Sequence, residues 1–362
     1  MASSIGKQFH CSIFGESHGQ MIGVEIDGVP PGEAIDENEL AQFMARRAPG
    51  NSQYTTKRKE PDQVHFACGL MNGVTTGFPL MAYIENTNQH SKDYSNLLDH
   101  PRPSHADYTA YVHYNGFADM RGGGHFSGRL TAPLCIAGGI AKQILKRHNI
   151  YIGAQLLQIE NITGRSFDAL QVTKEELEGI ATKSFPTLDA PAAEEMQKAI
   201  QAAAAQGDSV GGIVQGAIIG VPVGLGGPMF DGIENRMAQA LFGIPGCKGV
   251  SFGAGFDAVT MRGSEHNDPF IMENGTISTT SNHAGGILGG ITSGAPITVQ
   301  CAMKPTASIS MEQQTISLSK QTNEPLVITG RHDPCIAVRS VPVVEAVLAI
   351  VILDLLMEEH RI

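Results

Sequence analysis

The spacing of apolar and polar positions divides the chain into short strands and a few long helices. Apolar runs bounded by Gly, Pro and Asn predict strands at 63–70, 80–85, 212–220 and 296–303. Longer segments with helical apolar spacing predict helices at 36–47, 130–148, 190–206 and 336–360. Asp36 is suited to cap the first of these helices, and Gly207 to end the third.

The last helix is the most apolar segment of the chain. Its apolar stretch, 343–357, contains Glu345 and Asp354 and is too short to cross a bilayer. We therefore expect a buried helix, which Pro342 should kink or delay. The amino terminus has no apolar region of the signal-peptide kind, so we expect a cytoplasmic protein.

Three pairs of segments resemble one another in the same order, which indicates a degenerate internal duplication. Residues 15–32 align with 207–224 without gaps, with 8 of 18 positions identical, and residues 69–80 align with 286–297. Two arginines at the same spacing also precede each of two long helices: Arg121 and Arg129, and Arg331 and Arg339. We predict a single domain, 1–362, made of two related halves at about 1–150 and 151–362.

The order of strands and helices predicts an α+β fold. No Gly-x-Gly-x-x-Gly follows a strand and opens a helix, and no P-loop is present. We therefore expect antiparallel sheets packed on helices with pseudo-twofold symmetry, and not a doubly wound sheet.

Composition narrows the function. The net charge of −11 argues against a nucleic-acid partner, which requires a basic surface. The 42% hydrophobic and 17% charged content is that of a globular protein. Six scattered cysteines without a Cys-x-x-Cys pair are expected to be reduced.

The duplication singles out one histidine. His18 lies where the second copy has Val210. A position needed only for the turn would tolerate either residue. A histidine beside glycines is often structural, but its presence in one copy alone favours a function for His18.

A second histidine, His105, follows Arg102 in Arg-Pro-Ser-His-Ala-Asp. It could simply be a residue of a first helical turn that interacts with Asp107. The neighbouring Arg102 favours an anion site, because a guanidinium binds phosphate or carboxylate through two donors. Two histidines beside a bound anion can exchange protons near neutral pH.

Arginines gather in the loops rich in Gly and Pro, which indicates that this acidic chain binds anions locally. The alternative is a set of solvated ion pairs with Glu60, Asp62 or Asp333. Eight of the 13 arginines belong to this group: Arg46, Arg47, Arg58, Arg102, Arg121, Arg129, Arg331 and Arg339.

Three loops could hold such an anion. The segment 121–129, with three consecutive glycines, can offer successive backbone N–H groups to a phosphate. The second loop, 304–308, adds a lysine and hydroxyls. In the third loop, Asp333 lies near Arg331 and is either structural or able to move a proton. We expect no metal site, because the histidines lack the spacing of metal ligands: His18, His105, His125 and His283.

Five motifs together resemble the chorismate synthase family, in order from the amino terminus to the last helix. They are GESHG at 15–19, RPSHAD at 102–107, RGGG at 121–124, SNHAGGILGG at 281–290 and GRHDPC at 330–335. The resemblance implies a β-α-β sandwich of antiparallel sheets that enclose helices. It implies the last step of the shikimate pathway, in which 5-enolpyruvylshikimate 3-phosphate loses phosphate and a ring proton by 1,4-anti elimination to give chorismate.

The same resemblance implies cofactors and partners. Reduced FMN (FMNH2) would lend electron density transiently, without net redox change. A homotetramer, NADP and an external flavin reductase or other supply of reduced flavin are implied, with no nucleic acid and no membrane.

By resemblance, His18 would protonate the departing phosphate, His105 would protonate or hydrogen-bond the reduced flavin, and Asp333 would assist proton removal. The anionic groups of the substrate would be held by Arg47, Arg102, Arg129 and Arg331. FMN would be contacted by His125, Phe126, Ser127, Pro245, Gly246, Gly289, Lys304, Pro305, Thr306, Ala307, Ser308 and Arg331.

Two positions depart from the family pattern. Many relatives have arginine in place of Gln53, so that one anion contact is missing or is supplied by Lys57 or Arg58. Many also have arginine after the triple glycine, where this chain has His125. Two other functions also fit part of the sequence: a phosphate-releasing lyase or isomerase without flavin, and a non-catalytic binding protein for a phosphorylated metabolite. The binding protein does not explain why the second copy lacks His18.

Overall fold

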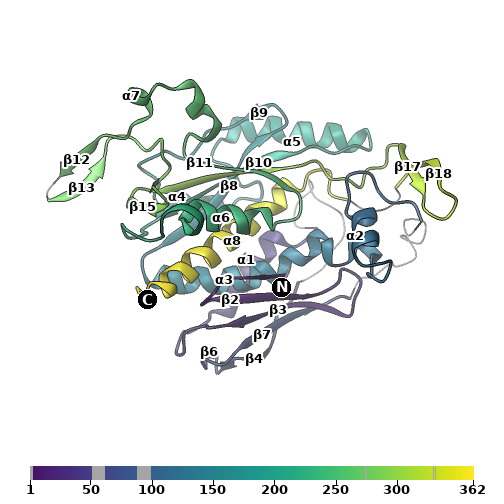
Figure 1. Ribbon diagram of the computed structural model, residues 1–362, viewed down its shortest axis with the longest axis horizontal. Helices are drawn as coiled ribbons and strands as arrows, with labels where there is room; N and C mark the ends of the chain where they lie inside the picture. Colours follow the sequence, from purple (N-terminus) through teal and green to yellow (C-terminus); the bar gives the residue numbers. More distant parts are fainter. Residues whose placement is uncertain (1–2, 51–61, 88–98, 274, 329, 331) are drawn as a thin grey trace.

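The computed structural model describes residues 3–50, 62–87, 99–273, 275–328, 330 and 332–362. Across these residues, two five-stranded antiparallel sheets lie on either side of a layer of helices (Figure 1). The first sheet has the order β1 (Ser4–Ile5), β2 (His10–Gly15), β3 (Met21–Asp27), β7 (Leu80–Glu85) and β4 (His65–Cys68). The second has the order β11 (Cys247–Phe252), β16 (Ile297–Met303), β10 (Gly212–Ile219), β8 (Tyr151–Ile159) and β9 (Ile162–Thr163).

The helix layer between the sheets completes the predicted α+β sandwich. It consists of α1 (Glu37–Arg47), α3 (Thr131–Arg147), α6 (Ile233–Phe242) and α8 (Ala337–Glu358). Two further helices pack on the outer side of the second sheet: α4 (Lys174–Ala181) and α5 (Ala190–Ala205). Each sheet therefore buries one apolar face against the helix layer, where the core lies.

Smaller elements project from the two ends of the sandwich in Figure 1. At one end lie α7 (Gly263–His266) and the hairpin β12 (Phe270–Glu273) with β13 (Thr276–Thr279). At the other end lie α2 (Asp107–His113) and the hairpin β17 (Gln313–Ser317) with β18 (Thr322–Leu326).

Helix α8 forms the centre of the core. By length and composition it could cross a membrane, but 94% of its most apolar stretch is buried inside the structure, as in the core helix of a globular protein. This confirms the predicted buried helix. Pro342 does not delay the start of this helix: α8 begins at Ala337, and Pro342 lies inside it.

The internal duplication is visible in the register of the sheets. In the first sheet Ile26 of β3 pairs with Leu80 of β7, and in the second Ile218 of β10 pairs with Ile297 of β16. These are the positions that the two sequence alignments place in correspondence. The pseudo-twofold duplication is thus a property of the fold, while the boundary near residue 150 stays a prediction.

A threonine braces the same turn in each half. The short hairpins β5 (Leu70–Met71) with β6 (Val74–Thr75), and β14 (Ile287–Leu288) with β15 (Ile291–Thr292), precede β7 and β16. Thr75 Oγ1 donates to Pro30 O over 2.6 Å, and Thr292 Oγ1 donates to Pro222 O over 2.6 Å. The shared Gly-Val-Pro-x-Gly sequence therefore encodes the same hydrogen bonds twice.

Sequence-based boundaries agree within two residues for the four predicted helices and within one residue for three of the four predicted strands. Asp36 caps α1 as predicted, accepting hydrogen bonds from the N–H groups of Asn38 and Glu39. The predicted strand 63–70 is instead two strands, β4 and β5, because Gly69 between them adopts a positive φ of 88°.

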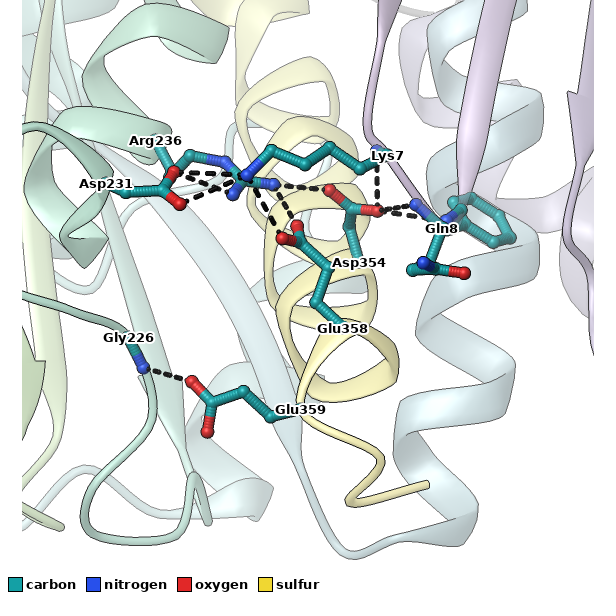
Figure 2. Close-up of polar contacts among 9 residues, drawn as sticks. Lys7, Gln8, Gly226, Asp231, Arg236, Asp354, Glu358 and Glu359 are labelled. Carbon is teal, nitrogen blue, oxygen red and sulfur yellow. Dashed lines mark hydrogen bonds and ion pairs between the residues drawn. The ribbon is translucent and has the colours of Figure 1, made fainter.

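A buried carboxylate ties the first strand to the last helix (Figure 2). Asp354 of α8 is 1% exposed, and its Oδ1 accepts from the N–H groups of Lys7, Gln8 and Phe9 over 2.7–2.9 Å. Its Oδ2 accepts from Arg236 Nη2 of α6 over 2.6 Å. The turn between β1 and β2 is thereby fixed on the helix layer.

We predict that Asp354→Ala lowers the free energy of unfolding by about 3–5 kcal/mol, because it leaves three backbone N–H groups and Arg236 without their buried acceptor. Asp231→Ala is the matched control, because Asp231 also pairs with Lys7 and Arg236 but its side chain is 61% exposed. It should cost less than about 1 kcal/mol. Urea-unfolding midpoints measure both, and equal effects would contradict this role for Asp354.

Candidate active site

A loop of three glycines brings the two predicted catalytic histidines together. Gly122, Gly123 and Gly124 have φ of 63°, 93° and 56°, in the region that favours glycine. A Cβ on Gly122 would lie 2.6 Å from His18 Nε2, and a Cβ on Gly123 would lie 3.4 Å from His105 Nε2. The two imidazoles therefore lie against neighbouring residues of one loop, which needs glycine there for space as well as for conformation.

His18 is a central residue of the turn between β2 and β3. Gly19 N donates to Glu16 O over 3.0 Å and closes this turn, and Ser17 N donates to Gly124 O over 3.1 Å. The His18 side chain is buried against the glycine loop. The position of this histidine is thus set by the glycine loop as well as by its own strands.

His105 is held by a carboxylate. Its Nδ1 lies 2.7 Å from Asp107 Oδ1, and Arg102 donates to both carboxylate oxygens of Asp107 over 2.8 Å. Burial disfavours the charged carboxylate, but the hydrogen bonds from Arg102 and His105 hold the pKa of Asp107 well below its ordinary value. An ionised carboxylate only accepts hydrogen bonds, so Nδ1 of His105 carries the proton. The other ring nitrogen of His105, Nε2, faces Gly123.

Two of the predicted substrate arginines share one buried carboxylate. Arg47 Nη1 donates to Asp62 Oδ2 over 2.5 Å, and Arg129 Nη1 donates to Asp62 Oδ1 over 2.6 Å. The Asp62 side chain is fully buried. Burial works against its charge, but Arg47 and Arg129 hold the pKa of Asp62 below its ordinary value.

The second half adds another arginine and carboxylate to this cluster. Arg339 Nη1 donates to Asp333 Oδ2 over 2.7 Å, and its Nε donates to the backbone oxygen of Arg47 over 2.9 Å. Burial lowers the pKa of Arg47 to about 10, assisted by the positive charges of Arg339 and Arg129 and opposed by Asp62. Arg47, Arg129 and Arg339 are thus held by Asp62 and Asp333 in one buried cluster to which both halves contribute.

A cavity of about 1150 Å³ opens beside this cluster and reaches Arg47, His105, Asp333 and Arg339. Most of the predicted FMN residues line it: His125, Phe126, Pro245, Gly246, Lys304, Pro305, Thr306 and Ala307. Its lining combines a lysine, hydroxyls and apolar side chains, which suits a group that carries both a phosphate and a flat ring system.

Other predicted residues lie outside the cavity lining. Ser308 accepts from Arg102 Nη1 over 3.2 Å, and Ser127 caps the segment before α3 by accepting from Arg129 N. Gly289 lies in the β14–β15 turn, which packs near α6. His18, Arg102 and Arg129 are buried and are not among the residues that line the cavity, and Arg331 lies outside the described residues.

The departure at His125 has a structural account. Its Nδ1 lies 2.7 Å from Gly15 O and its Nε2 lies 2.7 Å from Ser3 Oγ. The ring therefore links the end of β2 to the segment before β1, at the edge of the cavity. The other departure, Gln53, and its replacements Lys57 and Arg58 lie outside the described residues.

The group of eight arginines divides in the structure. Arg46 does not face the site: it pairs with Glu345, a buried residue of α8 that also binds Lys142. Arg121 pairs with Asp119 at the surface, which fits the alternative of solvated ion pairs for this residue. The four described arginines in the site are Arg47, Arg102, Arg129 and Arg339.

Sequence reasoning missed the partners that organise the site. From the sequence, Asp62 and Asp107 are named only as partners in the alternatives to an anion site, although both hold the predicted arginines. Asn86 accepts from Arg129 Nε over 3.0 Å and was not considered at all. Extending the second pairwise alignment by six residues would have placed Asn86 opposite Met303, a polar residue against an apolar one.

Paired histidines beside a glycine loop and a buried arginine cluster at a large cavity are features of an enzyme that acts on an anionic small molecule. The family model described as chorismate synthase matches residues 9–357. The chain therefore belongs to the chorismate synthase family, the lyases that form chorismate in the shikimate pathway.

Individual relatives agree with this assignment. A chorismate synthase of Dehalococcoides mccartyi is 44% identical, over 98% of this chain and 96% of the relative. That of Thermococcus kodakarensis is 43% identical, over 98% of each. A crystal structure of chorismate synthase matches with a TM-score of 0.76 and 27% identity, covering 98% of this chain and 93% of that one.

We predict that Asp107→Asn lowers turnover by about tenfold to a hundredfold, because an amide no longer fixes which nitrogen of His105 carries the proton. Asp168→Asn is the control, because Asp168 is an exposed aspartate that accepts only backbone N–H groups of its own loop among the described residues. Steady-state kinetics of the two purified variants test this. Equal turnover in both would remove Asp107 from the mechanism.

Proposed function

We propose that this enzyme converts 5-enolpyruvylshikimate 3-phosphate into chorismate and inorganic phosphate by 1,4-anti elimination, with reduced FMN in the same cavity. Membership of the chorismate synthase family supports the overall reaction. The finer statement is supported by the buried cluster of Arg47, Arg129 and Arg339 with Asp62 and Asp333, which lies beside the cavity. Guanidinium groups donate paired hydrogen bonds to phosphate and carboxylate groups, which this substrate carries.

The residues around the cavity suggest how the substrate is held. Arg47 and Arg129 lie with their charged ends fixed by Asp62, so they need little reordering when an anion binds. Arg102 is fixed by Asp107 in the same way. We assign these three arginines, together with Arg331, to the phosphate and carboxylate groups of the substrate.

The cavity lining fits FMN. Lys304 offers a cation for the flavin phosphate, Gly246 lines the same cavity with a positive φ of 90°, and Phe126 offers an apolar contact for the ring system. His125, Pro245, Pro305, Thr306 and Ala307 complete this set of contacts. When bound, reduced FMN supplies electron density transiently to the breaking C–O bond, which is why the overall reaction has no net redox change.

Two proton transfers are assigned to the protein. His18 protonates the departing phosphate, and Asp333 assists removal of the ring proton. His105, with Nδ1 held by Asp107, presents Nε2 as the atom that exchanges a proton or hydrogen bond with the bound flavin. A homotetramer, an external reductase linked to NADP and a cytoplasmic location remain predictions from the family resemblance.

The test is an anaerobic assay with FMN, dithionite and 5-enolpyruvylshikimate 3-phosphate. We predict release of one phosphate for each chorismate formed, together with a change in the flavin spectrum on adding substrate. With dithionite omitted and FMN kept oxidised, phosphate release should stop.

The possible results separate the candidate functions. Phosphate release that does not depend on reduced flavin would favour a lyase or isomerase without flavin. Tight binding of the substrate without phosphate release would favour a binding protein, and either result would contradict the proposal.

A further inference from the structure

The duplicated sheets allow each residue of the first half to be compared with its counterpart in the second. Asn86 follows β7, and its N–H donates to Gln20 O over 3.0 Å. At the same place in the second sheet, Met303 pairs with Gly212. Asn86 and Met303 are thus equivalent by register, as His18 and Val210 are equivalent by sequence alignment.

The Asn86 side chain clamps the turn that carries His18. Its Nδ2 donates to Gly19 O over 2.9 Å and to Glu16 O over 3.2 Å, the residues at the two ends of the turn. Its Oδ1 accepts from Arg129 Nε over 3.0 Å. One amide therefore connects the turn of a proposed proton donor to a proposed substrate arginine.

In the second half the aligned residues, 207–211, connect α5 to β10 instead of joining two strands. There Val210 N donates to Pro334 O over 2.9 Å, one position after the residue aligned with Ser17, whose N–H donates to Gly124 O. Met303 is buried and apolar, so the scaffold accommodates an apolar residue at this position of the strand. Positions 18 and 86, each polar in the first half and apolar in the second, lie at the same turn.

We propose that Asn86 is a positioning residue for the reaction, and this rests on the proposed roles of His18 and Arg129. By binding both ends of the turn and the Arg129 guanidinium, Asn86 fixes the proton donor relative to the arginine that holds the substrate. Small errors in such placement are costly, because a displacement of about 1 Å can reduce turnover about a hundredfold.

The first variant is Asn86→Met, which copies the residue of the second half. We expect kcat to fall by about tenfold to a hundredfold, while oxidised FMN binding and the melting temperature stay near wild type. Hydrogen exchange of the Gly19 amide should become faster, because the turn loses its clamp. This exchange measurement does not depend on catalysis.

A double-mutant cycle separates positioning from a general structural effect. In the His18→Ala background the turn no longer carries a proton donor, so Asn86→Met should change kcat by less than about twofold. Asn86→Asp keeps an acceptor for Arg129 but loses the donors to Glu16 and Gly19. It should lower kcat with little change in KM, and it serves as the second variant if Asn86→Met does not fold.

Asn282→Asp is the matched control. Asn282 also donates to two backbone oxygens, those of Ala169 and Pro296, over 2.8 and 2.9 Å, but in the second half. This variant should lower the melting temperature and leave kcat within about twofold of wild type.

Wild-type kcat in Asn86→Met, additive losses in the double mutant or unchanged exchange at Gly19 would each overturn the inference. An absence of phosphate release by the wild-type enzyme would instead overturn the proposed function, and the exchange measurement would still decide whether Asn86 holds the turn.

Discussion

The contact between α3 and α8 is the constraint on which the site depends. Gly138 of α3 lies so close to Ala346 of α8 that a Cβ on Gly138 would be 2.2 Å from the Ala346 Cα. Arg129 lies just before α3, and Arg339 lies in the first turn of α8. Because the two helices touch, guanidinium groups from both halves of the duplication reach one cluster of carboxylates, which neither half contains alone.

Burying that cluster of charged groups costs free energy. Charges removed from water need partners, and burial lowers the pKa of Arg47 to about 10. Asp62 and Asp333 hold the guanidinium groups in place. In the proposed function, the anionic substrate therefore meets guanidinium groups that are already ordered.

Sequence patterns predicted the scaffold better than the contacts within it. Periodicity and internal similarity were sufficient for the sandwich and the buried α8, because these features are local or repeated along the chain. A functional role for His18 stays a prediction. Asp62 and Arg129 are 67 positions apart, and no local pattern shows that they pair. The pairing of Arg46 with Glu345 could not be told from a site contact, because a guanidinium at the end of α1 can turn either way. The contacts of Asn86 with Glu16, Gly19 and Arg129 likewise join segments that lie far apart in the sequence.

In the proposed function, arginines from both halves form one anion site. Isothermal titration of 5-enolpyruvylshikimate 3-phosphate into the protein with oxidised FMN tests this directly, for wild type, Arg129→Met and Arg339→Met. Loss of a charged partner should weaken binding at least about tenfold in each variant. Wild-type affinity in Arg339→Met would confine the anion site to the first half and contradict the account.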